Sequence, residues 1–168
     1  MAAMIALSAV PTAGAEVTAA DLQAAVRSLG FLSSLERRSA IVIGVVYNSA
    51  DPGSKVLAVR ASAELSRLAG PGSSTISAAP VAVQELNGQR FDALYLTPLA
   101  AEHSRTVAEF VRRQSTVSVS SDPACLEAQS CVLMVQAHAS MSVVLDTALA
   151  KAVGARFSTV FTMLVKRR

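Results

Sequence analysis

The 168-residue chain has no tryptophan and only 4% aromatic residues, so its core must be built mainly from alanine, valine and leucine. It is 52% hydrophobic. Even so, no apolar run reaches the length of about 18 residues that a membrane span requires, because Arg, Glu, Asp or His interrupts each candidate. The length predicts one domain that can bury a core without needing disulfides or metal ions for stability.

Motifs of catalysis and phosphate binding are also missing. The sequence has no Gly-x-Gly-x-x-Gly after its first strand-like run, no Walker lysine loop, no His-Glu-x-x-His and no Gly-x-Ser-x-Gly. His103 and His138 have no Cys or carboxylate at ligand spacing, so we interpret them as surface or capping residues. Asp92 begins a predicted strand and Asp122 follows one, which puts them at opposite sheet edges. The sequence therefore predicts a protein without catalytic activity, cofactor or metal.

The charge balance does not favour nucleic-acid binding. The formal net charge is +3, and the basic residues occur in scattered groups without interleaved aromatics: Arg37-Arg38, Arg112-Arg113 and Lys166-Arg167-Arg168. Such groups are typical of solvated helix ends.

The N-terminus is typical of an export signal. Residues 1–15 carry no charge and contain the apolar run Met4–Val10, and small residues at Ala13 and Ala15 fit a cleavage site after Ala15. A flexible alanine-rich tail or a short core helix remains an alternative. We expect periplasmic export of a single domain spanning residues 16–168.

The stretch Ala40–Leu68 organises the chain. Ala40–Tyr47 is an apolar run without alternation, which predicts a strand covered on both faces, as in parallel sheets. A polar turn follows, and Ser54 is a candidate cap for the next helix, in which Leu57, Ala61 and Leu65 share a face. This is the first strand–helix unit of an α/β domain.

The rest of the chain alternates between strand and helix patterns. Thr18 followed by Asp21 predicts a capping box at the start of the first helix. The predicted helices are Thr18–Leu35, Ala100–Gln114, Asp146–Val153 and Phe157–Val165; the further strands are Val81–Leu86, Phe91–Thr97, Val117–Ser120, Cys131–Gln136 and Met141–Leu145. Alternation with short loops predicts a three-layer α/β fold. Its mostly parallel sheet would have about five strands, flanked by helices, with an antiparallel edge.

Polar residues follow several predicted strands and should collect at one sheet edge. They are Tyr47, Asn48, Ser49, Asp51, Thr97, Ser120, Ser121 and Asp122. Small ligands bind at the carboxyl edge of open α/β sheets. The alternative interpretation is that these residues only form turns.

Cys125 and Cys131 are the only cysteines, and five residues separate them. In an exported protein, a pair so close most simply forms a local disulfide. A redox-active pair and a pair of metal ligands remain alternatives.

Four segments give the chain a resemblance to a known family. In their order and spacing, Ile41–Val46, Phe91–Leu96, Val117–Asp122 and the ending Val143–Ser158 resemble the YfiR family of bacterial periplasmic regulators. Cys125 and Cys131 match the position of a disulfide in some members. Asp146 departs from the family, in which Asn is common at that position.

The resemblance implies a non-enzymatic periplasmic regulator. It would repress a membrane-bound diguanylate cyclase by binding the periplasmic sensor region of the cyclase, and thereby lower cyclic di-GMP and biofilm formation. The resemblance also implies sequestration by an outer-membrane lipoprotein, and homodimerisation. A disulfide that reports oxidising stress could couple redox state to partner binding.

A second hypothesis comes from another class of protein. The segments Ile43–Asn48 and Asp92–Thr97 are also similar to one lobe of the substrate-binding proteins of ABC transporters. In that case the protein would be a periplasmic solute-binding module, although one lobe alone cannot close on a ligand in the usual way.

Overall fold

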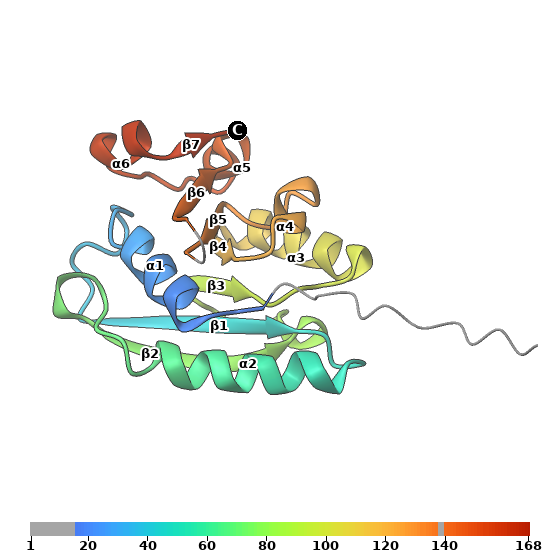
Figure 1. The fold of residues 1–168 in the computed structure, drawn as a ribbon. Helices are drawn as coiled ribbons and strands as arrows, with labels where there is room; N and C mark the ends of the chain where they lie inside the picture. The colour runs from blue at the N-terminus through green and yellow to red at the C-terminus, as the bar shows by residue number, and fades with distance from the viewer. Residues whose placement is uncertain (1–15, 138–139) are drawn as a thin grey trace, which may run out of the picture.

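The computed structural model describes residues 16–137 and 140–168, so the predicted signal peptide and His138 lie outside the described residues. Within this part of the chain, seven strands form one sheet in the order β2-β1-β3-β4-β5-β6-β7 (Figure 1). The strands are β1 (Ala40–Tyr47), β2 (Thr75–Ala82), β3 (Ala93–Leu96), β4 (Val117–Ser120), β5 (Leu133–Gln136), β6 (Ser142–Leu145) and β7 (Lys166–Arg167). Strands β1 to β5 are parallel, and β6 pairs antiparallel with β5. The predicted mostly parallel α/β sheet is confirmed, and β6 forms the expected antiparallel pair with β5. The sheet has seven strands in the described residues instead of about five, and β7, which pairs parallel with β6, takes the edge position expected for β6.

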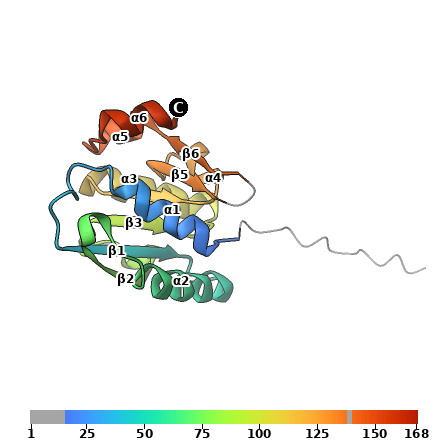
Figure 2. The ribbon, with the colours of Figure 1, turned by 60° about the vertical axis from the view of Figure 1, so that its left-hand side comes forward.

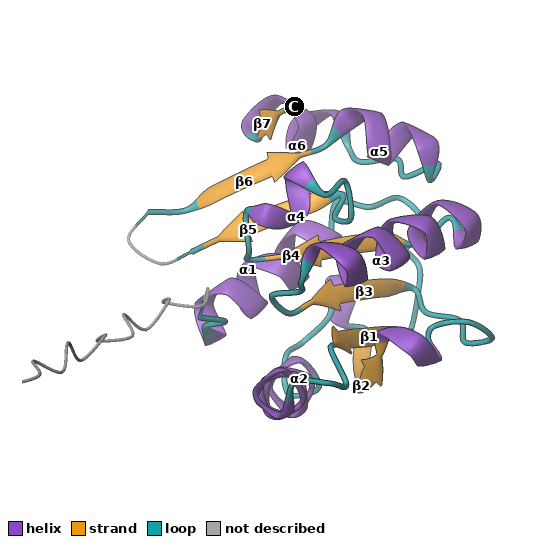
Figure 3. Cartoon of the chain, turned by 90° about the vertical axis from the view of Figure 1, so that its right-hand side faces the viewer, coloured by secondary structure: helices purple, strands orange, loops and turns teal. Residues whose placement is uncertain are grey.

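Helices cover both faces of the sheet. They are α1 (Ala19–Leu29), α2 (Pro52–Leu65), α3 (Ala101–Gln114), α4 (Ala124–Glu127), α5 (Thr147–Ala152) and α6 (Thr159–Leu164), with single 3-10 turns at η1 (Pro71–Ser73) and η2 (Val83–Glu85). Helices α1 and α2 lie side by side on one face (Figure 2). Helices α3 and α4 cover the other (Figure 3). The two faces follow from right-handed crossovers, because β1-α2-β2 and β3-α3-β4 progress in opposite directions along the sheet.

Strand β1 is at the centre of the core, as its apolar run predicts. Val45 and Val46 have no exposed surface. Gly44 lies under the ring of Phe91, and a Cβ at this position would come within 2.9 Å of that ring and of Leu94. The glycine therefore allows Phe91 to pack directly on the strand backbone.

The position of β2 differs from the prediction. The sequence predicts a strand at Val81–Leu86, whereas β2 runs from Thr75 to Ala82 and Val83–Glu85 forms a 3-10 turn. Because β2 is an edge strand, part of it faces solvent and small residues suffice there. Ala82 pairs with Tyr47, so the chain leaves the sheet where β1 ends.

The lead helix is shorter than predicted. Helix α1 ends at Leu29 instead of Leu35, and turns follow. Tertiary pairing with the C-terminal region holds these turns: Ser33 N donates to Arg156 O at 2.9 Å, and Ser158 N donates to Phe31 O at 2.9 Å. For the same reason Phe157 lies in a bridge to Leu32, and the last helix begins only at Thr159.

Two helix starts test the capping predictions. Thr18 and Asp21 form the expected capping box at the start of α1. Ser54 does not cap α2, since Asp51 takes that position and Pro52 follows at the first helical position. The Ser54 hydroxyl instead accepts a hydrogen bond from Asn48 N at 3.0 Å. Among the described helices, none is long and apolar enough to cross a membrane.

Candidate functional site

The strand order creates a switch point between β1 and β3. From β1 the chain moves outward to β2, and it then returns to β3 and continues toward β5. In open α/β sheets, ligands bind outside the carboxyl ends of the strands at this reversal. We therefore describe the residues that follow β1, β3 and β4, which we call the carboxyl edge.

Residues after β1 form an exposed turn at this edge. Tyr47, the last residue of β1, is buried; Asn48 is half-buried, and Ser49 and Asp51 are exposed. Asn48 Oδ1 accepts from Ala50 N at 3.0 Å, and Asp51 Oδ1 accepts from Gly53 N at 2.9 Å. Neither the amide nitrogen of Asn48 nor the second oxygen of Asp51 is used by these bonds.

The hydroxyls that follow β3 and end β4 are largely used inside the protein. Thr97 Oγ1 donates to Val46 O at 2.8 Å, and Ser120 Oγ donates to Leu96 O at 2.9 Å. Both side chains are buried. These hydrogen bonds connect the ends of β1, β3 and β4, as the turn-forming interpretation predicts. Contact with a ligand would therefore come from the more exposed neighbouring residues.

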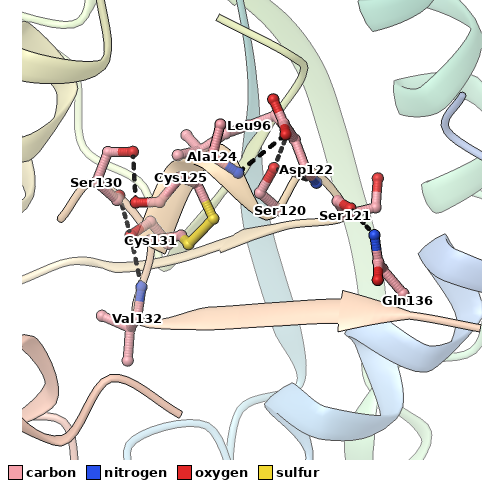
Figure 4. Close-up of a disulfide and its surroundings, with 11 residues drawn as sticks. Leu96, Ser120, Ser121, Asp122, Ala124, Cys125, Ser130, Cys131, Val132 and Gln136 are labelled. Carbon is pink, nitrogen blue, oxygen red and sulfur yellow. Dashed lines mark hydrogen bonds between the residues drawn. A yellow bond between two sulfur atoms is a disulfide. The ribbon is translucent and has the colours of Figure 1, made fainter. Parts of the chain in front are cut away.

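Asp122 is the partly exposed member after β4. Its backbone N–H donates to Ser120 Oγ at 3.1 Å, and its Oδ1 accepts from Ala124 N at 3.0 Å (Figure 4). These bonds fix the position of the carboxylate and do not use its second oxygen. Asp92 directly precedes β3 and so lies at the opposite edge, as the sequence predicts.

Polar contacts next to the carboxyl edge connect β3 and β5 to the segment that follows β4. Tyr95 on β3 donates from its phenol to Ser121 Oγ at 3.1 Å, and Gln136 Nε2 donates to Ser121 O at 3.1 Å. Asp21 of α1 is also fully buried. Burial raises the pKa of Tyr95 well above its usual range; the hydrogen bond to Ser121 opposes this, and the nearby charge of Asp21 adds to it.

Sequence reasoning missed three contributors to this region. Tyr95 and Gln136 lie inside predicted strands, and the sequence pattern around them does not indicate their polar contacts. Gln84 Oε1 accepts from Ser49 Oγ at 3.0 Å, so it also borders the edge. A correct placement of β2 would have identified Gln84 as a residue that follows a strand.

The predicted disulfide between Cys125 and Cys131 is present. Their Cα atoms are 5.4 Å apart, and the bond closes the connection from β4 to β5 (Figure 4). Ser118 Oγ donates to Ser130 O at 2.7 Å and accepts from Val132 N, which fastens the same connection to β4. The segment that begins with Asp122 is thus held against the sheet. In the described ranges, no group of three or more His, Cys, Asp or Glu could hold a metal ion.

Comparisons with known proteins show the fold. No family model and no curated protein matches the chain. A solved structure from Streptococcus pneumoniae, described as an ABC domain in complex with L-Trp, has a TM-score of 0.60 at 14% identity and is matched over 88% of this chain and 61% of its own. A ligand-free, open structure of a substrate-binding protein with adhesive properties from Clostridium difficile has a TM-score of 0.58 at 14% identity, over 84% of this chain and 58% of its own. The chain has the α/β fold of substrate-binding domains and spans about three fifths of the length of these two matched chains.

Proposed function

We propose that the protein is a non-enzymatic periplasmic binding domain that holds a small polar solute at the carboxyl edge. The observation that carries this proposal is the placement of Asn48, Thr97 and Asp122 after three adjacent parallel strands, at the switch point of the sheet. The fold shared with substrate-binding proteins supports it. Export with cleavage after Ala15 is part of the same proposal.

The chemistry of the edge matches an amino acid. The Asn48 amide nitrogen is a donor for a carboxylate, and the second oxygens of Asp51 and Asp122 are acceptors for an ammonium group. Strands β1 and β4 are two strand spacings apart, which is about 10 Å. An amino acid can reach across this distance, and one of the similar structures is described with L-Trp.

Thermal denaturation of the purified protein with the common amino acids tests the proposal. We expect at least one to raise the melting temperature, because a ligand that binds only the folded state stabilises it. Replacing Asn48 with Ala should remove this shift. The matched control is Asn87→Ala, since Asn87 accepts from Arg113 in the loop before β3, away from the carboxyl edge. No shift with any amino acid, or an equal loss in both variants, would refute amino-acid binding at this edge.

A second candidate function is the regulator that the family resemblance implies. One observation favours a protein partner: the outward side of α2 exposes two apolar side chains, Val56 at 59% and Val59 at 48%. We propose that a cyclase sensor region would bind there, with release through an outer-membrane lipoprotein. Dimerisation belongs to the same candidate.

A pull-down of the oxidised protein from membrane extracts tests the regulator. Recovery of a diguanylate cyclase by the native chain, and its loss with Val56→Asp/Val59→Asp, would support it. Recovery of transport components alone would favour the solute-binding function. Equal recovery of the cyclase by the variant would place the interface elsewhere.

A further inference from the structure

A separate apolar cavity lies on the α1 side of the sheet, away from the carboxyl edge. Its volume is about 590 Å³, which is within the range of small-molecule sites. Most of the apolar side chains that line it come from α1, the following turn, β6 with its preceding residue, and α6: Val26, Phe31, Met141, Val143, Phe161 and Leu164. Phe31 and Phe161 stack with ring centroids 4.9 Å apart.

The rim of this cavity leaves apolar surface in water. Met141 is 62% exposed and Leu164 is 76% exposed, although both belong to the lining. A bound apolar molecule would cover these side chains, and each square ångström of apolar surface removed from water contributes about 25 cal/mol. The cavity therefore favours a ligand with a long apolar body.

One residue of the lining favours an anion. Arg27 is the single charged side chain in the lining, is exposed, and belongs to the last turn of α1. The carbonyls of that turn would disfavour an anion, but the following N–H groups already bind them. Gly30 N donates to Val26 O and Arg27 O, Phe31 N to Ser28 O, and Leu32 N to Leu29 O.

We infer that this cavity binds a single-chain amphiphile with an anionic head group, of the fatty-acid class. The alkyl chain lies against Val143 and the Phe31–Phe161 pair, and the carboxylate is bound by Arg27. Beyond Arg27, the lining side chains include only one polar group, Ser28, so a ligand with many polar substituents would lose hydrogen bonds on entry.

Calorimetric titration with decanoate, below its micelle concentration, tests the inference on delipidated protein. We expect saturable binding at one site. Arg27→Gln should weaken decanoate binding about tenfold, because it removes a charge-assisted hydrogen bond, and should leave binding of the neutral analogue 1-decanol unchanged. Arg105→Gln, an exposed arginine of α3, is the control and should bind decanoate like the native chain.

Two adjacent residues on α6 can distinguish binding in the cavity from binding elsewhere on the same surface. Leu164 lines the cavity and Met163 does not, yet they are 76% and 78% exposed. Leu164→Glu should abolish saturable decanoate binding, because it places a negative charge at the rim, and Met163→Glu should retain it. Asn48→Ala should also retain it, so this result is independent of the carboxyl edge.

Three outcomes would overturn the inference. The first is no saturable binding to the native chain, or equal loss in the Leu164 and Met163 variants. The second is sedimentation of the protein with phosphatidylglycerol vesicles when free decanoate does not bind, which would assign the surface to a bilayer. The third is a dimer, detected by sedimentation velocity, that both α6 variants dissociate, which would show that a second copy covers the cavity.

Discussion

Asp21 at the start of α1 accepts a hydrogen bond from the backbone N–H of Ala137, 116 residues later, at a distance of 2.7 Å. The same carboxylate completes the capping box with Thr18. A single buried side chain thus fixes the first helix of the domain to the end of β5.

Replacing Asp21 with Ala should strongly destabilise the protein. The variant loses a helix cap and leaves the N–H of the half-buried Ala137 without this partner, so we expect a loss of about 2 to 4 kcal/mol in the free energy of unfolding. Urea denaturation measures it. Asp51→Ala is the matched control, because this exposed cap of α2 should cost only about 1 kcal/mol. Similar losses in the two variants would show that the contact with Ala137 contributes little.

Tyr95 should make the fold sensitive to alkaline pH. Burial raises the pKa of Tyr95 in the folded state, so above pH 10 the unfolded chain loses the phenolic proton while the folded chain keeps it. Stability should therefore fall as the pH rises above 10, with a slope of about 1.4 kcal/mol per pH unit from this group.

The variant Tyr95→Phe isolates this contribution. At neutral pH it should lose about 1 kcal/mol, because the hydrogen bond to Ser121 is gone. Above pH 10 its urea midpoint should fall less steeply than that of the native chain. Parallel curves for the two proteins would mean that Tyr95 ionises normally in the folded state.

The disulfide should hold a local connection and not the whole fold. Its loop is short, with a sequence separation of 6, so replacing both cysteines with serine should lower the free energy of unfolding by about 2 kcal/mol. Circular dichroism should show the native content of helix and strand. If reduction instead changed the affinity for a cyclase partner, the redox hypothesis would gain support; an unchanged affinity would exclude it.

The exposed side of β2 should resist pairing with a second chain. Ser66 at the end of α2 accepts from Ala78 N at 3.1 Å, and Pro80 has no N–H to offer. The variant Ser66→Ala/Pro80→Thr leaves the backbone N–H groups of residues 78 and 80 free to pair with the strand of a second chain. It should therefore raise the sedimentation coefficient at high protein concentration. Ser77→Ala, on the same strand, is the control. An unchanged coefficient would show that neither residue protects the edge.

Local patterns were sufficient for the central part of the fold. The run Ala40–Tyr47 predicts β1 because both faces of this strand are covered, and the Thr18–Asp21 spacing predicts the start of α1 because capping needs only neighbouring residues. The end of α1 could not be predicted in this way. The turns around Leu32 are held by Phe157 and its neighbours, which are more than 120 residues away in the sequence.

The candidate site was predictable in position and less so in chemistry. Residues that follow parallel strands must meet at one edge, so Asn48, Thr97 and Asp122 were placed together by topology alone. Which of their polar atoms would be used internally depends on distances across strands. The Thr97 hydroxyl donates its hydrogen to Val46 O, whereas the hydrogen bond within the Asp122 turn uses only one of the two carboxylate oxygens.

The most direct test of solute binding is an amide NMR titration of the ¹⁵N-labelled protein with amino acids. Binding at the carboxyl edge predicts saturable shifts of the Asn48–Asp51, Thr97 and Ser120–Asp122 amides, with little change in α6. Shifts confined to the cavity beside α6 and α1, or no saturable shift with any amino acid, would contradict the proposed function.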